Sequence, residues 1–299
     1  GRHYRRVPEL PLRLARAAHE AEAAPFAAYR LDASGWEALE IASWLHDCGK
    51  LTTPEYVIDK ATKLETLYNR IHEIRTRFEV LKRDAEIAYW KGLAQGGDEA
   101  HLRAARDELW RTLDEDFAFV AACNRGSEDM PAESQQRLER IARKRWLRTL
   151  DDGLGLSNAE LARRGGVPAK PLPADEPLLR DDPADVIPRP PSDHLAEGNP
   201  WGFSMRAPAN LYNGGELYNL RIRHGTLTEE ERFKVKEHII ESIVMLSRLP
   251  FPSDLAAVPE MAGGHHETMD GRGYPRGLCG SDMSMTARIM ALAAIFEAL

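Results

Sequence analysis

Apolar residues recur at helical spacing along residues 36–45. A capping box formed by Ser34 and Glu37 is expected to open this helix. Its apolar stripe consists of Ile41, Ala42 and Leu45. Because such a stripe packs against other elements, the residue that follows it, His46, is expected at the core end of a buried helix.

A longer periodic pattern starts near Leu64. The first run of apolar positions, spaced alternately by three and four residues, is Leu67, Ile71, Ile74, Phe78, Leu81, Ala85 and Ala88. After a turn at residues 96–98, a second run contains Leu102, Leu109, Leu113, Phe117 and Val120. A third helix, rich in Arg and Glu, is expected from Ser134 to Leu150. This spacing predicts either an antiparallel helical arm or a self-associating coiled coil, and both would bury the same stripe.

The composition changes after Asp152 to Pro, Asp and Gly. The prolines of this stretch are Pro168, Pro171, Pro173, Pro177, Pro183, Pro188, Pro190, Pro191 and Pro200. Proline fixes its own backbone angle and lacks a donor, so no regular helix is expected at that density. We interpret the stretch as a linker or an extended strap, whose aromatic end at residues 201–203 packs against an apolar surface.

The composition argues against two classes of protein, those that insert in a membrane and those that bind nucleic-acid duplexes. The chain has 299 residues, 43% hydrophobic content and a net charge of -7, and it holds no apolar run long enough to cross a bilayer. We therefore predict no membrane insertion by this segment and no affinity for DNA or RNA duplexes. Three distant cysteines indicate a reducing compartment, and a cytoplasmic location is expected.

Two pairs of neighbouring polar residues carry the chemistry. His46 is followed by Asp47, and His265 by His266. Burying imidazoles beside a carboxylate is costly unless hydrogen bonds or a metal ion satisfy them. Imidazoles and carboxylates are common ligands of divalent ions such as Mn and Fe, so these pairs predict a metal site. Five other histidines are expected to be packed or surface residues: His19, His72, His101, His194 and His224.

Both motifs resemble those of a known family. The run His46-Asp47-Cys48-Gly49-Lys50 resembles the signature of the HD superfamily of phosphohydrolases. The run from His265 to Pro275, which contains Gly-Tyr-Pro, resembles its HD-GYP branch, bacterial phosphodiesterases that hydrolyse cyclic di-GMP. The resemblance implies an all-α fold, an HD-type bundle of about five to seven helices with its metal site in the core.

The resemblance also implies a set of metal ligands. Asp47 would bridge two divalent ions, Fe or Mn, with a hydroxide between them. The histidines around the ions would be His46, His238, His265 and His266, and His3 is a further candidate. Thr228 and Glu231 form a capping box that is expected to open the helix carrying His238. Lys50 would face the scissile phosphate.

The Gly-Tyr-Pro loop is predicted to border the substrate. Gly271 and Gly273 need backbone freedom or close approach, and Asp270 can cap the amides of their turn. Tyr274 and Pro275 would form a rigid aromatic corner. Arg272 and Arg276 are candidates for contacts with phosphate or guanine, and a role as solvated loop arginines is the alternative.

One position departs from the family pattern. Ala294 stands where the resemblance predicts a metal-binding aspartate. A methyl group cannot bind a cation, so one metal is expected to be weakened or lost. Glu297, one helical turn away, is a poor substitute. An introduced substitution and a naturally degenerate site both explain the alanine.

Four segments are expected: residues 1–62 and 215–299 as the two parts of the HD-GYP domain, 63–152 as the helical arm, and 153–214 as the strap.

Three functions fit the sequence. The first is hydrolysis of cyclic di-GMP to pGpG or GMP, the second a degenerate module that binds cyclic di-GMP or a protein without cleaving it, and the third hydrolysis of another cyclic dinucleotide. Expected partners are a second copy bound through the arm, and a diguanylate cyclase or a sensor domain of a larger protein, which in some members of the family is membrane-bound.

Overall fold

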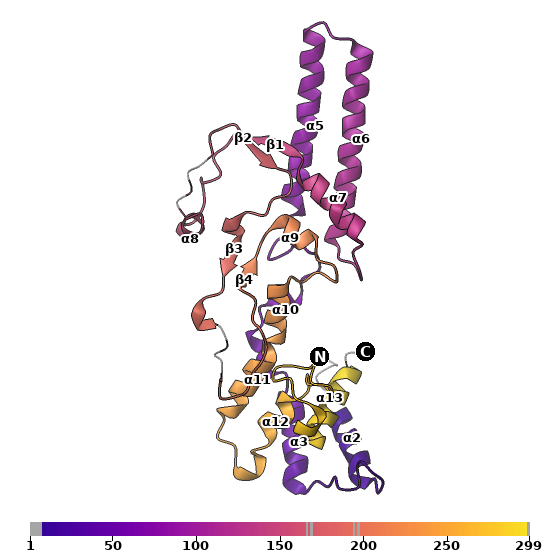
Figure 1. The fold of residues 1–299 in the computed structure, drawn as a ribbon, viewed down its shortest axis with the longest axis vertical. Helices are drawn as coiled ribbons and strands as arrows, with labels where there is room; N and C mark the ends of the chain where they lie inside the picture. Colours follow the sequence, from indigo (N-terminus) through magenta and orange to yellow (C-terminus); the bar gives the residue numbers. More distant parts are fainter. Residues whose placement is uncertain (1–7, 166, 168–169, 194, 196–197, 298–299) are drawn as a thin grey trace. The chain divides into compact units, whose positions relative to one another are not determined.

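The computed structural model describes residues 8–165, 167, 170–193, 195 and 198–297. These residues are mainly helical, with two small two-stranded sheets (Figure 1), so the predicted all-α fold class is confirmed. They fall into two compact units. The first joins residues 1–58, 191–207 and 233–299, and the second comprises residues 59–190 and 208–232.

The boundaries of the two units fall at different residues from the boundaries of the four expected segments. Residues 191–207, in the middle of the expected strap, belong to the first unit, and the rest of that strap belongs to the second. The four-segment division therefore stays a proposal about domains.

The first unit is a helical bundle. In its described part the α-helices are α2 (Glu9–Glu20), α3 (Ala33–Leu45), α4 (Glu55–Ile58), α11 (His238–Ser247), α12 (Val258–Gly263) and α13 (Met285–Glu297). Short 3-10 helices are η1 (Cys48–Thr52), η3 (Pro191–Asp193), η4 (Ser253–Leu255) and η5 (Gly280–Asp282). Helix α10 (Glu229–Lys236) crosses the sequence limit between the units.

Helix α3 packs against α2, α12 and η4. Its buried Ala42 packs with Leu246 and Val258, while Leu39 packs with Met290 of α13. The predicted capping box is wrong, because the N-cap lies two residues earlier than the expected Ser34. Asp32 is the N-cap residue, and its Oδ1 accepts a hydrogen bond of 2.8 Å from the Gly35 amide.

The end of the strap docks on α11, as predicted. Phe203 is 7% exposed and packs against Ile239, Ile240 and Ile243. Trp201 lies over the Phe203 ring, with the ring centres 5.8 Å apart and the planes 13° apart. This contact holds residues 199–205 beside the helix that carries His238.

The second unit contains the predicted arm, built from α5 (Ile71–Ala94) and α6 (Glu99–Asn124). The two helices lie side by side in Figure 1 and are joined by the expected turn at residues 95–98. Ile74, Phe78 and Leu113 are buried between them. Leu67 is not part of the seam, because it precedes the helix and is 89% exposed. Self-association through the arm stays a prediction.

The predicted third helix is too long. Helix α7 spans Ala132–Ala142, and Arg145–Arg148 then forms strand β1, which pairs antiparallel with β2 (Ala174–Pro177). A partner strand about 30 residues away supplies backbone hydrogen bonds that a local helical pattern cannot reveal. The other elements of this unit are α8 (Asn158–Arg163), η2 (Pro183–Asp185), β3 (Val186–Pro188), its partner β4 (Asn210–Asn213), and α9 (Glu216–Leu220).

A buried ion pair stabilises the second unit. Lys60 Nζ lies 2.8 Å from Glu231 Oε2, and the two side chains are 1% and 3% exposed. The same carboxylate accepts the Thr228 amide at 2.9 Å, and the Thr228 hydroxyl accepts the Glu231 amide at 3.2 Å. The predicted capping box at the start of α10 is therefore confirmed.

None of the helices in the described ranges is both long and apolar enough to span a membrane.

Candidate metal centre

Asp47 is positioned by a close contact between η1 and α11. The Gly49 amide donates a hydrogen bond of 2.8 Å to Ser242 Oγ. A Cβ atom at Gly49 would lie 1.9 Å from the His238 carbonyl oxygen, so only glycine allows this approach. The contact places Asp47, at the end of α3, directly beside His238.

His238 is the first residue of α11. The prediction that the capping box opens the helix carrying His238 is wrong in one respect, because α10 ends at Lys236 and a turn at Glu237 intervenes. His265 and His266 follow α12, whose C-cap is Gly264. Three separate elements thus bring four histidines to one carboxylate.

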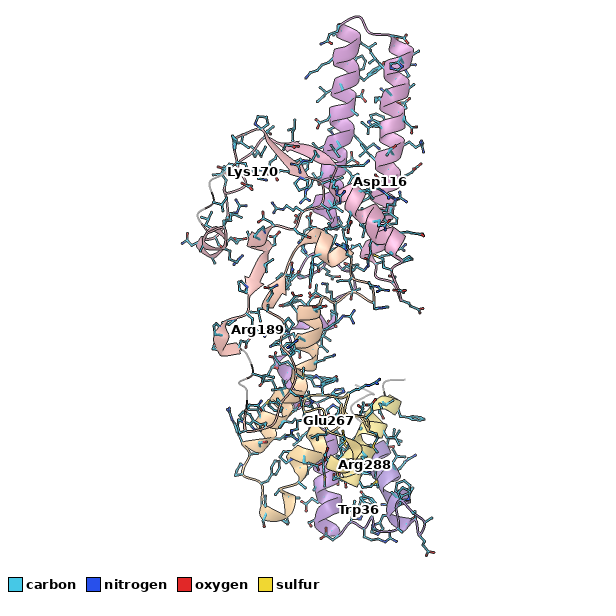
Figure 2. All side chains as sticks on the ribbon, viewed as in Figure 1. Trp36, Asp116, Lys170, Arg189, Glu267 and Arg288 are labelled. Atoms are coloured by element: carbon cyan, nitrogen blue, oxygen red, sulfur yellow. The ribbon has the colours of Figure 1, made fainter. Side chains whose placement is uncertain are left out.

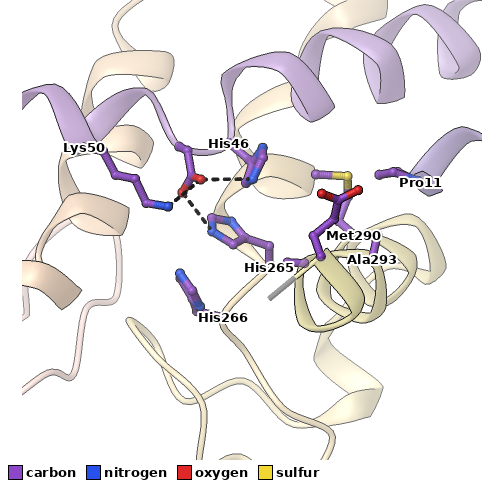
Figure 3. Close-up of a pocket in the computed structure, with 10 residues that line it drawn as sticks. Pro11, His46, Lys50, His265, His266, Met290 and Ala293 are labelled. Atoms are coloured by element: carbon purple, nitrogen blue, oxygen red, sulfur yellow. Dashed lines mark hydrogen bonds and ion pairs between the residues drawn. The ribbon is translucent and has the colours of Figure 1, made fainter. Parts of the chain in front are cut away.

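The Asp47 carboxylate and the four imidazoles lie close together, and Figure 3 shows His46, His265 and His266 with Lys50 around the pocket. Asp47 Oδ2 lies 3.4 Å from His46 Nε2 and 2.7 Å from Lys50 Nζ, whereas Asp47 Oδ1 lies 3.3 Å from His238 Nε2 and 3.7 Å from His265 Nε2. His266 Nε2 lies 3.3 Å from His238 Nε2.

Backbone carbonyls determine the tautomers of three imidazoles. In each case Nδ1 faces the carbonyl oxygen of the residue three positions earlier, at 2.9 Å for His46, 2.5 Å for His238 and 2.6 Å for His265. A carbonyl oxygen can only accept, so each Nδ1 carries the proton. Each Nε2 then turns a lone pair toward Asp47, as in metal sites whose ligands are oriented by outer hydrogen bonds.

Burial and neighbouring groups keep His46, His266 and Asp47 in the protonation state that binds cations. Burial, with help from the nearby His265, lowers the pKa of His46 to about 4. Burial and the neighbouring His265 and His238 lower the pKa of His266 to about 2. For Asp47 burial alone would raise the pKa, but the surrounding histidines and Lys50 outweigh it and hold this pKa below its usual range. At neutral pH His46 and His266 are therefore neutral and Asp47 is charged.

Hydrogen-bond acceptors of the Asp47 carboxylate and of His265 face one another in the site. Asp47 Oδ1 and His265 Nε2 are buried and have no hydrogen-bond partner among the described residues. Buried polar atoms without partners are rare and costly, and a cation between them removes the cost. There are two groups of three residues in which the ligand atoms lie within 4.8 Å of one another, and the groups share one histidine. They are His46, Asp47 and His265, and His238, His265 and His266. The residues therefore fit divalent metal ions.

The site opens into a pocket of about 150 Å³. Its lining consists of Pro11, His46, Asp47, Lys50, His265, His266, Met290, Ala293, Ala294 and Glu297. Ala294 thus does line the cavity in which the sequence leads us to expect a carboxylate, and it offers no ligand atom. His3, the further candidate ligand, lies outside the described residues.

The Gly-Tyr-Pro loop folds back on the histidine pair. Gly271 has φ +76°, and a Cβ atom at Gly273 would lie 2.4 Å from Glu267 Cα. Asp270 Oδ1 accepts the Arg272 amide at 3.1 Å, as expected for a cap. Tyr274 stacks on His266, with ring centres 4.7 Å apart and planes 14° apart.

The two loop arginines are placed differently. The Arg272 side chain is 88% exposed beside Asp270. Arg276 Nε donates a hydrogen bond of 2.8 Å to the Trp201 carbonyl oxygen, and its guanidinium lies 6.0 Å from the centre of the Phe203 ring. Arg272 therefore has the freer side chain of the two for a ligand, while Arg276 joins the loop to the strap.

Two residues near the histidines were not predicted. Glu267 is 3% exposed and accepts two backbone amides of the loop. Its place directly after His266 was a sequence signal that could have identified it. Lys236 Nζ lies 5.3 Å from the centre of the Tyr274 ring, a contact that only the tertiary fold creates.

Comparison with known proteins gives a consistent result. Residues 186–299 match a family described as the HD domain. The chain is 41% identical over 115 residues to 3'3'-cGAMP-specific phosphodiesterase 1 of Vibrio cholerae, a match that covers 36% of this chain and 26% of the relative. No solved structure gives a significant match.

Two relatives are named cyclic di-GMP phosphodiesterases. One from Vibrio cholerae is 39% identical over 82 residues, which are 26% of this chain and 17% of the relative. One from Thermotoga maritima is 38% identical over 78 residues, which are 26% of this chain and 21% of the relative. The chain spans about a quarter or less of the length of these three relatives.

Proposed function

Because the chain carries an HD domain of the HD-GYP type, we propose that it is a metal-dependent phosphodiesterase that hydrolyses cyclic di-GMP to linear pGpG or GMP. The observation that carries the proposal is the cluster of four imidazoles around the Asp47 carboxylate, beside a pocket that Asp47 and three of these histidines line, with buried acceptors that lack partners among the described residues. Such a set of ligands suits borderline divalent ions, and we favour two ions of Fe or Mn.

The ligands proposed for these ions are His46, Asp47, His238, His265 and His266. Divalent ions held there would lower the pKa of water and neutralise charge on phosphoryl oxygens. Asp47 contributes the negative charge of one group, and its Oδ1 also lies 3.3 Å from His238 Nε2 of the other group. His265 belongs to both groups, which supports two adjacent ion positions.

The substrate would be held by charges at the edge of the pocket. The Lys50 ammonium is half exposed and lies 2.7 Å from Asp47 Oδ2, so it can approach a phosphate without leaving the site. Asp270, Gly271, Gly273 and Pro275 shape the loop beside it. Arg272, Tyr274 and Arg276 are the proposed contacts to phosphate or base.

Hydrolysis of cyclic di-GMP and of 3'3'-cGAMP, followed by chromatography with added Mn²⁺ or Fe²⁺, tests the proposal. The assay compares this chain with Ala294→Asp, and metal content is measured for both. We expect little turnover by this chain and higher turnover and metal content for the variant, because aspartate adds a ligand. Absence of hydrolysis of both dinucleotides by both proteins would contradict the proposed activity.

Two alternatives correspond to other outcomes of the same assay. Preference for 3'3'-cGAMP would assign the third predicted function, which is supported by the relatives named for that substrate. Binding of cyclic di-GMP without cleavage, even with Asp at position 294, would assign the signalling module, which Ala294 supports.

A further inference from the structure

The histidines of the site are not all oriented in the same way. His46, His238 and His265 each hold a backbone carbonyl through Nδ1. In the described part of the chain, His266 Nδ1 makes no such bond. Its ring is instead covered by Tyr274, nearly parallel at 14° and 4.7 Å between ring centres. Rotation of the imidazole about χ2 would break this stacking, so the tyrosine takes over the orienting role that carbonyls have elsewhere.

Tyr274 is held in turn by a buried carboxylate. Glu267 Oε1 accepts the Arg276 amide at 2.7 Å, and Glu267 Oε2 accepts the Leu278 amide at 2.9 Å. Among the described residues no Lys, Arg or His forms an ion pair with Glu267, so both oxygens are used for backbone amides. Hydrogen bonds to a charged acceptor are about twice as strong as neutral ones, which makes this a firm attachment. Glu267 lies in the first unit (Figure 2).

The loop is also attached at other points. The Tyr274 amide donates to the His266 carbonyl oxygen at 3.1 Å, and the Ser204 amide of the strap donates to the Pro275 carbonyl oxygen at 2.8 Å. Gly273 packs directly on the Glu267 backbone. Glu267 thus links Arg276 and Leu278, which follow Tyr274–Pro275, back to the histidine motif, and the loop has little freedom to move the ring.

We propose that Glu267 is a positioning residue for His266, acting through Tyr274. The carboxylate fixes the loop, the loop fixes the tyrosine ring, and the ring fixes the direction of His266 Nε2 toward the site. The inference rests on the proposed metal centre. It concerns metal affinity, whatever substrate the site takes.

Metal binding by purified protein tests the chain of contacts. Mn²⁺ affinity is measured by calorimetry, and the ligand field of bound Co²⁺ by visible absorption. Glu267→Gln keeps the shape but turns an NH₂ group toward a backbone amide, and Tyr274→Leu removes the ring. We expect each to weaken Mn²⁺ binding about three- to tenfold and to change the Co²⁺ spectrum.

Controls separate positioning from folding. Tyr274→Phe keeps the ring and should bind Mn²⁺ like the unaltered chain. Glu260→Gln is a matched change on α12, since the Glu260 carboxylate accepts bonds from Ser284 and not from the loop. It should leave the Co²⁺ spectrum unchanged, whatever its effect on the melting temperature.

A double variant tests whether Glu267 acts through the tyrosine. Glu267→Gln combined with Tyr274→Leu should bind Mn²⁺ no more weakly than Tyr274→Leu alone, because the second change has already removed the ring. Fully additive losses, or an unchanged Mn²⁺ affinity and Co²⁺ spectrum in Glu267→Gln, would overturn the inference. Absence of metal binding by the unaltered chain would overturn it as well. Normal metal binding without hydrolysis of cyclic dinucleotides would contradict the proposed function only.

Discussion

Acid should destabilise the metal-free protein through its buried histidines. His46 and His266 have pKa values lowered by burial to about 4 and about 2 in the folded state, whereas a histidine in the unfolded chain titrates near 6.5. Between these values the unfolded state binds more protons than the folded state. The free energy of unfolding therefore rises with pH and is lost as the pH falls below about 6.5.

The size of this loss of stability depends mainly on the pKa of the histidines in the unfolded chain. Each histidine that stays neutral in the fold costs about 1.4 kcal/mol per pH unit once the pH is well below 6.5. Between pH 7 and pH 5 this amounts to about 2 kcal/mol per histidine, and to about 4 kcal/mol for His46 and His266 together. That is a large share of the roughly 5–15 kcal/mol by which proteins are stable.

Urea unfolding in the presence of a chelator, at pH values from 5 to 8, measures the loss. Comparison between variants removes contributions shared by the whole chain. His46→Gln should recover about 2 kcal/mol of the difference between pH 7 and pH 5. His101→Gln, at an exposed position on the arm, should change nothing. A pH dependence of stability in His46→Gln equal to that of the unaltered chain would refute the reasoning.

Three other changes test the site and the core. His266→Ala should lower the metal content measured by elemental analysis with little loss of helical circular dichroism; full metal content would mean that the ligand assignment is wrong. Gly49→Ala places a methyl group against the His238 carbonyl and should cost about 1–3 kcal/mol in urea unfolding, and an unaffected stability would show that η1 can shift. Lys60→Met leaves the Glu231 carboxylate buried and unpaired, so we expect a loss of about 3–5 kcal/mol that Lys60→Met/Glu231→Gln partly recovers. Equal losses in the single and double variants would contradict that account.

The sequence predicted correctly those features that depend on residues close together in the chain. The apolar spacing predicted the helices of the arm, and the Thr228–Glu231 capping box was predicted because both partners lie within one turn. The third helix was predicted to reach Leu150, but β1 takes its partner from residues 174–177. A strand whose partner is distant in sequence leaves no helical or turn signal near itself.

The residue types of the site could be recognised without the fold. Adjacent His-Asp and His-His pairs and a glycine-rich loop predicted metal ligands and a substrate border, since those residue types have few other uses when buried together. How these residues meet depends on the fold. The contact of Gly49 with α11 brings Asp47 to His238, carbonyls three residues earlier turn the imidazoles, and Glu267 and Tyr274 hold His266. These relations depend on distances of a few ångströms between residues far apart in the chain, and sequence spacing carries no information about such distances.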